Sequence, residues 1–221
     1  MSTEIKAEVH MISGCQDRQT SADVSNVANF KLPDPAGRSG GACTSALLRV
    51  LYSNQTQPEN ELTFQQVLLE MREKLRQDGY EQIPQLTSSK MVDVQSEPFN
   101  FVPAQNTDGR KRAVLIGINY VGQDGELSGC HNDVGNMKKY IMEVQGFQEE
   151  DILVLMDDGY HIQPTKENIM NAYRKMVNES EYGDSVFCHY SGKNEAQPIF
   201  YRNKWFDINI LLFSLHLSPS K

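Results

Sequence analysis

The chain has 221 residues, of which 39% are hydrophobic and 23% charged, and its formal net charge at pH 7 is −8. These values are typical of one compact globular domain that can bury a good core. The negative balance, together with the lack of a basic run of five or more residues, argues against a nucleic-acid-binding protein.

Targeting and redox signals point to a cytoplasmic protein. The first thirteen residues contain no apolar stretch of the kind found in secretory signals. The longest apolar run, residues 208–217, has ten residues, whereas a membrane-spanning helix needs roughly 20. The cysteines at positions 15, 43, 130 and 188 lack CxxC spacing, so we expect reduced thiols and no zinc site.

The first half of the chain predicts a strand, a loop and a helix. Residues 5–12 alternate weakly between apolar and polar and end at Ser13-Gly14, which is typical of a strand followed by a turn. Residues 30–41 contain two prolines and three glycines and therefore predict a loop. Residues 42–52 are apolar enough to predict a short helix.

A second helix and an edge strand follow. Thr63 lies at capping-box spacing from Gln66, apolar residues then recur at helical period, and Gly79 predicts the end of this helix. Residues 82–88 predict an edge strand, because Pro84 cannot donate a hydrogen bond to a central ladder.

The second half alternates strands and helices. Strands are predicted at residues 113–118, 152–156 and 185–190, with helices ending near Gly146 and beginning at Thr165. A β-α-β-α-β run implies a parallel sheet with right-handed crossovers. Ligand sites in such sheets lie beyond the carboxyl ends of the strands, which is where the loop after the first strand and the residues after the third would lie.

Several long strings resemble the metacaspases, which are caspase-like cysteine endopeptidases. The strings that resemble the large, p20-type subunit are KRAVLIGINY (111–120), ELSGCHND (126–133), DILVLMDD (151–158), PTKEN (164–168) and HYSG (189–192). The strings that resemble the small, p10-type subunit are MISGCQDRQTSADV (11–24), PDPAG (33–37) and GACTSALL (41–48).

The p10-type strings precede the p20-type strings, an order that resembles the permuted type III metacaspases. The resemblance implies a caspase-like α/β fold, a three-layer sandwich whose mostly parallel sheet has helices on both faces, here circularly permuted and incomplete. We therefore expect a p10-like region at 1–102, a linker at 103–110, an incomplete p20-like region at 111–192, and a tail at 193–221 that resembles nothing in the family.

The resemblance also places the family's catalytic histidine directly after Ser191-Gly192, where this chain has Lys193. A lysine with an ordinary pKa near roughly 10.4 is a cation at pH 7 and a poor general base. Asn194 stands where the family has a glycine, and no cysteine follows it to serve as the family's nucleophile. We therefore assign no catalytic residue and expect a chain that stops short of the catalytic pair.

The four cysteines offer no clear replacement for the missing nucleophile. Cys188 and His189 leave the predicted strand on opposite faces, and both are typical of side chains packed under helices. Cys15 and Cys43 have no identified histidine partner. Cys130 follows a glycine at the rim where ligands bind, which makes it the best of the four, but it also lacks a base.

The resemblance implies that Cys130, Asp133 and Ser191 line the pocket for the substrate side chain. Metacaspases cut after Arg or Lys, and a basic side chain needs a partly desolvated carboxylate at the pocket floor. The alternative for Asp133 is a helix N-cap, which contributes about 1 kcal/mol. The residues expected to border the same cleft are Asp17, Gln19 and Asp23.

No metal ligand or cofactor is assigned. The acidic residues 149–151 and 157–158 are adjacent in sequence, which is typical of a solvated loop or helix start, whereas calcium takes six to eight oxygens from spaced ligands. Many metacaspases need calcium, but the family's calcium carboxylates lie after the catalytic histidine.

Two functional hypotheses remain open. The first is a member of the Arg/Lys-directed cysteine endopeptidases that is inactive in this chain because the catalytic pair is missing. The alternative is a non-catalytic pseudopeptidase that binds basic peptides or a partner metacaspase. A nucleotide-binding domain is disfavoured, because neither G-x-G-x-x-G nor a P-loop follows the strand at 113–118.

Overall fold

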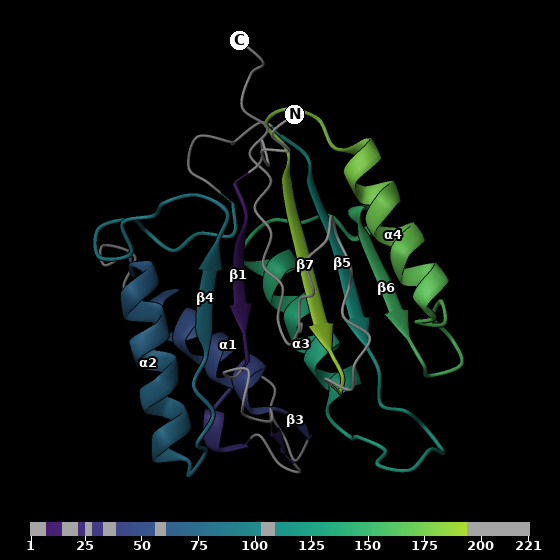
Figure 1. Ribbon diagram of the computed structural model, residues 1–221, viewed down its shortest axis with the longest axis horizontal. Helices are drawn as coiled ribbons and strands as arrows, with labels where there is room; N and C mark the ends of the chain where they lie inside the picture. Colours follow the sequence, from purple (N-terminus) through teal and green to yellow (C-terminus); the bar gives the residue numbers. More distant parts are fainter. Residues whose placement is uncertain are drawn as a thin grey trace.

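A computed structural model describes most of the two predicted halves. The described residues are 8–14, 22–24, 28–32, 39–55, 61–102 and 109–193, and Figure 1 draws the other residues as a thin grey trace. Residues 5–7 of the first predicted strand, most of the predicted linker and all of the predicted tail except Lys193 therefore lie outside the described residues.

Three parallel strands form the central sheet of the second half. The order is β6-β5-β7, with β5 at Lys111–Gly117, β6 at Ile152–Met156 and β7 at Ser185–Ser191. Gly117 lies opposite both Met156 and Ser191, so the carboxyl ends of the three strands are level. Residues 113–117 are all buried, as expected for a parallel strand covered on both faces.

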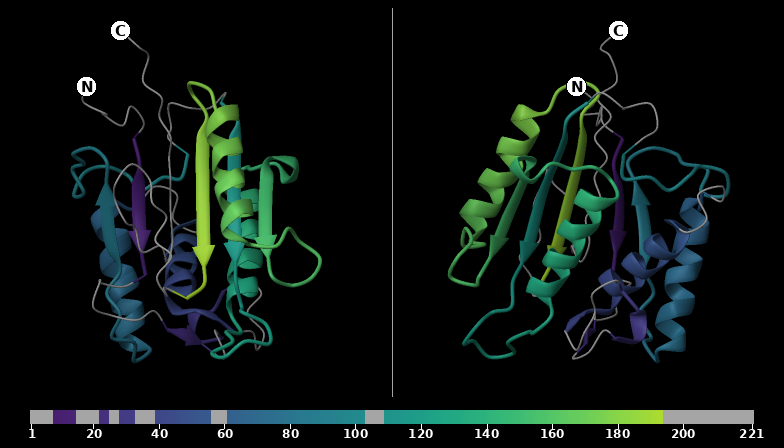
Figure 2. Two further views of the ribbon diagram at one scale, coloured as in Figure 1. Left: turned by 45° about the vertical axis from the view of Figure 1, so that its right-hand side comes forward. Right: turned by 180° about the vertical axis from the view of Figure 1, so that it is seen from behind.

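The two crossover helices cover opposite faces of this sheet (Figure 2). They are α3, Cys130–Glu143, and α4, Lys166–Glu179, and Thr165 caps α4 by accepting a hydrogen bond from the Asn168 N–H at 3.2 Å. Leu115 and Phe187 belong to the apolar cluster on the α3 side, whereas Val114 and Cys188 belong to the cluster on the α4 side. The predicted α/β sandwich with helices on both faces is thus confirmed.

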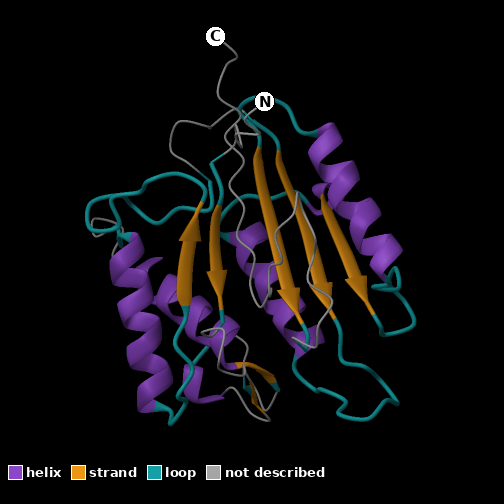
Figure 3. Ribbon diagram, viewed as in Figure 1, coloured by secondary structure: helices purple, strands orange, loops and turns teal. Residues whose placement is uncertain are grey.

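The first half contributes two helices and an antiparallel pair of strands. Helix α1 spans Ala42–Gln55, α2 spans Phe64–Gln77, and β1, His10–Ser13, pairs with β4, Gln85–Ser88. The predicted capping box of α2 is present, with Thr63 N–H donating to Gln66 Oε1 at 2.8 Å and Gln66 N–H donating to Thr63 Oγ1 at 3.3 Å. Figure 3 shows the order β4, β1, β7, β5, β6 across the molecule.

The short elements are where the sequence-based prediction was wrong. The last two residues of the predicted loop 30–41 form β3, Gly40–Gly41, which pairs antiparallel with β2, Asp23–Val24. A two-residue strand carries no period from which it could be predicted. Single 3₁₀ turns occur at Ala28–Phe30 and Glu149–Asp151.

One apolar core joins the two halves. Phe101, which precedes the predicted linker, has its ring centroid 5.1 Å from that of Phe187 on β7 and 5.7 Å from that of Tyr140 on α3. The Tyr140 ring in turn lies 5.1 Å from Tyr52 of α1.

In the part of the chain that the structure describes, no helix has both the length and the apolarity needed to cross a bilayer.

The aromatic contact between the halves can be tested with Phe101→Ala. We expect this variant to lower the free energy of unfolding by about 3–5 kcal/mol, because it leaves a cavity against α3 and β7. Urea unfolding measures the loss. Met91→Ala is the control, since Met91 is fully exposed and its truncation should cost less than about 0.5 kcal/mol. Equal costs for the two variants would contradict a shared core.

Candidate functional site

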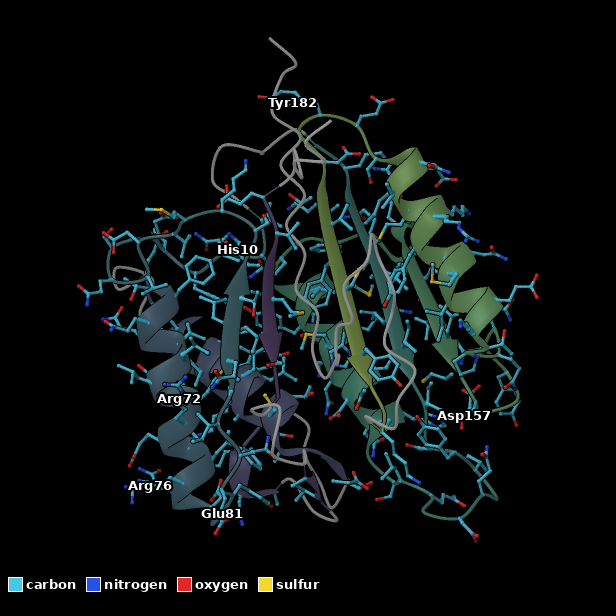
Figure 4. The ribbon with its side chains drawn as sticks, viewed as in Figure 1. His10, Arg72, Arg76, Glu81, Asp157 and Tyr182 are labelled. Atoms are coloured by element: carbon cyan, nitrogen blue, oxygen red, sulfur yellow. The ribbon has the colours of Figure 1, made fainter. Side chains whose placement is uncertain are left out.

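The candidate site lies at the edge of the sheet where β5, β6 and β7 all end. The loops that follow these strands begin at Ile118, Asp157 and Gly192. Figure 4 places Asp157 at this end of the sheet and His10 and Tyr182 toward the other. The parallel arrangement therefore brings together three segments that are distant in sequence, as expected for a ligand site in this class of fold.

Asp133 is the centre of the site. Its side chain lies in the first turn of α3 and is almost fully buried. The carboxylate accepts hydrogen bonds from the Gly41 N–H, at 2.9 and 3.0 Å to its two oxygens, and from Ser191 Oγ at 2.7 Å. Thr44 of α1 adds a further side-chain hydrogen bond. One carboxyl group thus links α3 and β7 of the second half to β3 and α1 of the first.

Asp133 does not cap its helix, so the N-cap alternative is wrong. The N-cap residue is Gly129, which has no side chain to offer, and the first helical N–H, that of Cys130, donates instead to Asn119 Oδ1 at 3.0 Å. The Asp133 carboxylate is directed toward Gly41 and Ser191 rather than toward the amides of α3.

Burial makes the charge of Asp133 costly. Desolvation raises the pKa of this carboxyl to about 7, and the nearby Asp23 carboxylate adds to the effect. The hydrogen bonds from Ser191, Gly41 and Thr44 favour the ionised form but only partly offset the burial. Asp133 therefore changes charge near neutral pH, unlike an ordinary carboxyl group.

The predicted neighbours Cys130 and Ser191 lie beside Asp133. Ser191 hydrogen-bonds to both the Cys130 thiol and the Asp133 carboxylate, so the three residues that the resemblance implied lie together. Burial raises the pKa of the Cys130 thiol to about 12, and the Asp133 charge contributes to this rise. Because the thiolate is the nucleophilic form, Cys130 is not poised for attack at neutral pH.

Three of the four described histidines lie beside carboxylates, and the fourth, His189, does not. His189 is fully buried, and burial lowers the pKa of its ring to about 3, with Nε2 lying 3.5 Å from Thr44 Oγ1. His131 and His161 contact the carboxylates of Asp157 and Asp158, at 2.6 and 2.7 Å, and His10 Nε2 lies 3.0 Å from Glu8 Oε1. As predicted, Cys188 and His189 face opposite sides of β7.

Asp23 lies at a second contact between the halves. Its Oδ2 accepts hydrogen bonds from the Ser128 N–H at 2.9 Å and from Ser128 Oγ at 3.2 Å. Nearby, Asn132 Nδ2 donates to the Ser39 carbonyl at 2.9 Å. Of the residues expected to border the cleft, Asp23 is thus placed against the loop that leads into α3. The other two, Asp17 and Gln19, lie outside the described residues.

Asp157 organises the loop after β5, a role that the sequence did not reveal. It accepts hydrogen bonds from the N–H groups of Asn119 at 2.9 Å and Val121 at 3.3 Å, as well as from His131 Nε2. Burial raises the pKa of Asp157, but these hydrogen bonds outweigh it and hold the pKa below its ordinary value. The sequence suggested a solvated acidic pair. Two adjacent carboxylates form no sequence pattern from which their hydrogen-bond donors could be predicted.

Both carboxylates of the acidic pair 157–158 accept hydrogen bonds from nearby N–H groups and histidine rings. The oxygens of Asp157 are bonded to N–H donors, and those of Asp158 accept from the Tyr160 N–H, the His161 N–H and the His161 ring. Calcium needs six to eight free oxygens around one point. Across the described ranges, no group of three or more His, Cys, Asp or Glu side chains could hold a metal ion.

Comparison with known proteins gives matches in both halves. Residues 1–94 match the family model described as Caspase domain, and residues 111–211 match the model described as Metacaspase, peptidase C14 domain. The chain is 55% identical over 189 residues to "Metacaspase III c" of Phaeodactylum tricornutum, covering 85% of this chain and 56% of that protein.

Fungal relatives match over a shorter stretch. "Metacaspase-1A" of Neurospora crassa is 47% identical over 89 residues, covering 39% of this chain and 20% of that protein. "Metacaspase-1" of Sclerotinia sclerotiorum is 46% identical over 101 residues, covering 44% and 23%. The chain therefore spans about half the length of the Phaeodactylum relative and less than a quarter of these two fungal proteins.

The buried carboxyl group gives stability a pH dependence that can be tested with Asp133→Asn. A carboxyl whose pKa rises on folding stabilises the fold fully below its ordinary pKa and loses this contribution as pH rises toward 7. Relative to the variant, we expect the wild type to lose roughly 2–3 kcal/mol of unfolding free energy between pH 5 and pH 8. Denaturant unfolding at several pH values measures this difference.

Asp93→Asn is the matched control for this experiment. Hydrogen bonds from Ser96 and Gln95 lower the pKa of the exposed Asp93 carboxyl, so its contribution should be constant between pH 5 and pH 8. A wild-type curve that runs parallel to the Asp133→Asn curve over this range would show that Asp133 is ionised throughout.

Proposed function

Because the chain belongs to the metacaspase family of caspase-like peptidases, we propose that it carries the recognition part of an Arg- or Lys-directed cysteine endopeptidase without the catalytic pair. The caspase-domain match precedes the metacaspase match, an order consistent with the type III relative. Protein substrates follow from the peptidase family, and the preference for basic side chains is our proposal.

The single observation that supports basic-side-chain recognition is the contact of Asp133 and Cys130 with Ser191 at the carboxyl end of the sheet. A desolvated carboxylate binds an ammonium or guanidinium group much more strongly than an exposed one does. Ser191 is the donor that an incoming cation would replace, because its hydroxyl can rotate whereas the Gly41 N–H is fixed by the backbone. A bound cation would also favour the ionised carboxyl group.

The proposal that this chain does not cleave peptides is based on Lys193. It stands where the family has its catalytic histidine, and its Nζ donates to the Asp124 carbonyl at 3.0 Å rather than pointing to a thiol. With the Cys130 thiol protonated at neutral pH, neither a general base nor a thiolate is supplied at this position. The same observations favour the second candidate, a pseudopeptidase that binds basic peptides or a partner metacaspase.

Absence of turnover is the first test. We expect the 221-residue chain not to hydrolyse fluorogenic peptides that end in Arg or Lys, with or without millimolar calcium. The variant Lys193→His should also be inactive, because a histidine cannot act without a thiolate partner. Turnover that survives Cys130→Ala would point to a contaminating peptidase, whereas turnover that Cys130→Ala abolishes would show that Cys130 is a nucleophile after all.

Binding is the second test and does not require catalysis. Calorimetry should show that a peptide ending in Arg aldehyde binds more tightly than the same peptide ending in norleucine aldehyde. Asp133→Asn should weaken binding of the Arg peptide by roughly 2–5 kcal/mol, the typical cost of removing one partner of a buried charge pair. Binding to the wild type should be up to about tenfold weaker at pH 6 than at pH 8, because Asp133 must ionise.

Two results would count against basic-side-chain recognition. One is equal affinity of the wild type for the Arg and norleucine peptides. The other is equal affinity of the wild type and Asp133→Asn for the Arg peptide, which would leave Asp133 with a structural role between the two halves.

A further inference from the structure

The loop between β5 and α3 contacts the ammonium group of Lys193. Lys193 Nζ lies 5.1 Å from the centroid of the Tyr120 ring and donates a hydrogen bond to the Asp124 carbonyl oxygen at 3.0 Å. An ammonium within about 6 Å of a ring centroid is attracted by the negative face of the ring. A side-chain carbon at Gly125 would overlap the Lys193 ammonium, so the glycine leaves the space that this group fills.

The backbone that presents the ring is held in an uncommon conformation. Tyr120 has φ +57°, a left-handed value that is rare for a bulky residue. Asp157 accepts hydrogen bonds from the N–H groups on both sides of it, those of Asn119 and Val121. The Tyr120 side chain is in addition hydrogen-bonded to Tyr190. Strained residues that their surroundings fix in place are typical of binding sites.

The rest of the loop is fixed in the same way and has the charge that a cation needs. Glu126 Oε2 accepts a hydrogen bond from the Gly122 N–H at 2.8 Å, and the Leu127 N–H donates to the Asn119 carbonyl at 2.7 Å. Residues 118–129 contain two carboxylates and no lysine or arginine. The local field therefore favours a positive group over a negative one.

We propose that the Tyr120 ring, the Asp124 carbonyl and the Gly125 gap form a binding site for a primary ammonium group. Lys193 occupies this ammonium site within the chain. The lysine side chain of a peptide competes with Lys193 for the same site. The site differs from the pocket at Asp133, which is buried and bonded to Gly41, and the inference does not rest on the proposed function.

The geometry favours lysine over arginine as the ligand. The site offers one carbonyl acceptor and one aromatic face around the space left by a glycine. An ammonium is a compact charge that suits a single acceptor, whereas a planar guanidinium has five donors that need several acceptors. A lysine side chain supplied from outside must also displace the tethered Lys193, which has the advantage of a high effective concentration.

The ammonium site can be tested by removing its occupant. The probe is N-acetyl-lysine N-methylamide, and N-acetyl-norleucine N-methylamide is its uncharged counterpart. We expect Lys193→Ala to bind the lysine probe at least about fivefold more tightly than the wild type, because the internal competitor is gone. Shifts of the Gly125 amide signal in NMR titrations report binding at this site, and the norleucine probe should leave that signal unchanged.

Further variants separate the ring from its hydroxyl. In the Lys193→Ala background, Tyr120→Phe keeps the aromatic face and should retain binding, whereas Tyr120→Leu should weaken it about two- to fivefold, as expected for loss of an exposed cation–π contact. Lys175→Ala is the matched control, because it removes a largely exposed lysine of α4 and should behave as the wild type.

Each of the following outcomes would overturn the proposal. They are equal responses of the wild type and Lys193→Ala, an equal response to the norleucine probe, and undiminished binding after Tyr120→Leu. The proposal would also be overturned if the Gly125 amide signal of Lys193→Ala did not shift at the highest concentration of the lysine probe. Because Lys193 is absent from this variant, competition by Lys193 could not explain the lack of binding.

Discussion

The Asp133 carboxyl group accepts hydrogen bonds from the backbone of β3 and from the hydroxyl of Ser191, and through them it joins two parts of the chain that are distant in sequence. This one group on α3 thereby contacts Gly41 of β3 and Ser191, the last residue of β7. A carbon added at Gly41 would come within 2.7 Å of Asp133 Oδ2, so the approach of the backbone to the carboxylate requires glycine.

The same burial has opposite consequences for structure and for recognition. A carboxyl group without water is costly to ionise, and its hydrogen bonds offset only part of that cost. It is also the kind of group that pairs most strongly with a cation, since little solvent screens the charge. Burial suppresses the Cys130 thiolate at the same place, so the features that suit a specificity pocket are those that make this cysteine unreactive.

The loop between β5 and α3 shows how a second carboxylate gives shape to a segment without regular structure. Asp157 accepts hydrogen bonds from N–H groups of this loop and from the ring of His131. These hydrogen bonds hold Tyr120 in its left-handed backbone conformation. Loops that present ligand-binding groups from a rigid sheet are common in parallel α/β folds. In this chain the loop lies between two acidic anchors, Asp133 on the helix that follows it and Asp157 at the end of the neighbouring strand.

The sequence by itself determined the elements with a strong period and the family. Buried strands such as β5, the capping box at Thr63 and the cap at Thr165 are local signals, because each depends on residues within a few positions of one another. The family strings also indicated that Cys130, Asp133 and Ser191 lie in one place, although 58 positions separate the last two. The p10-like, linker, p20-like and tail boundaries stay predictions.

Only the tertiary structure decided what those residues contact. The Gly41 and Thr44 partners of Asp133 come from the other half of the chain, and the two-residue strands that seat Gly41 have no period to reveal them. Asp157 looked like one of two solvated carboxylates until the fold placed it against the loop after β5. Hydrogen bonds between distant segments depend on packing in three dimensions, and so do the pKa shifts that burial causes. The order of neighbouring residues along the chain does not predict this packing.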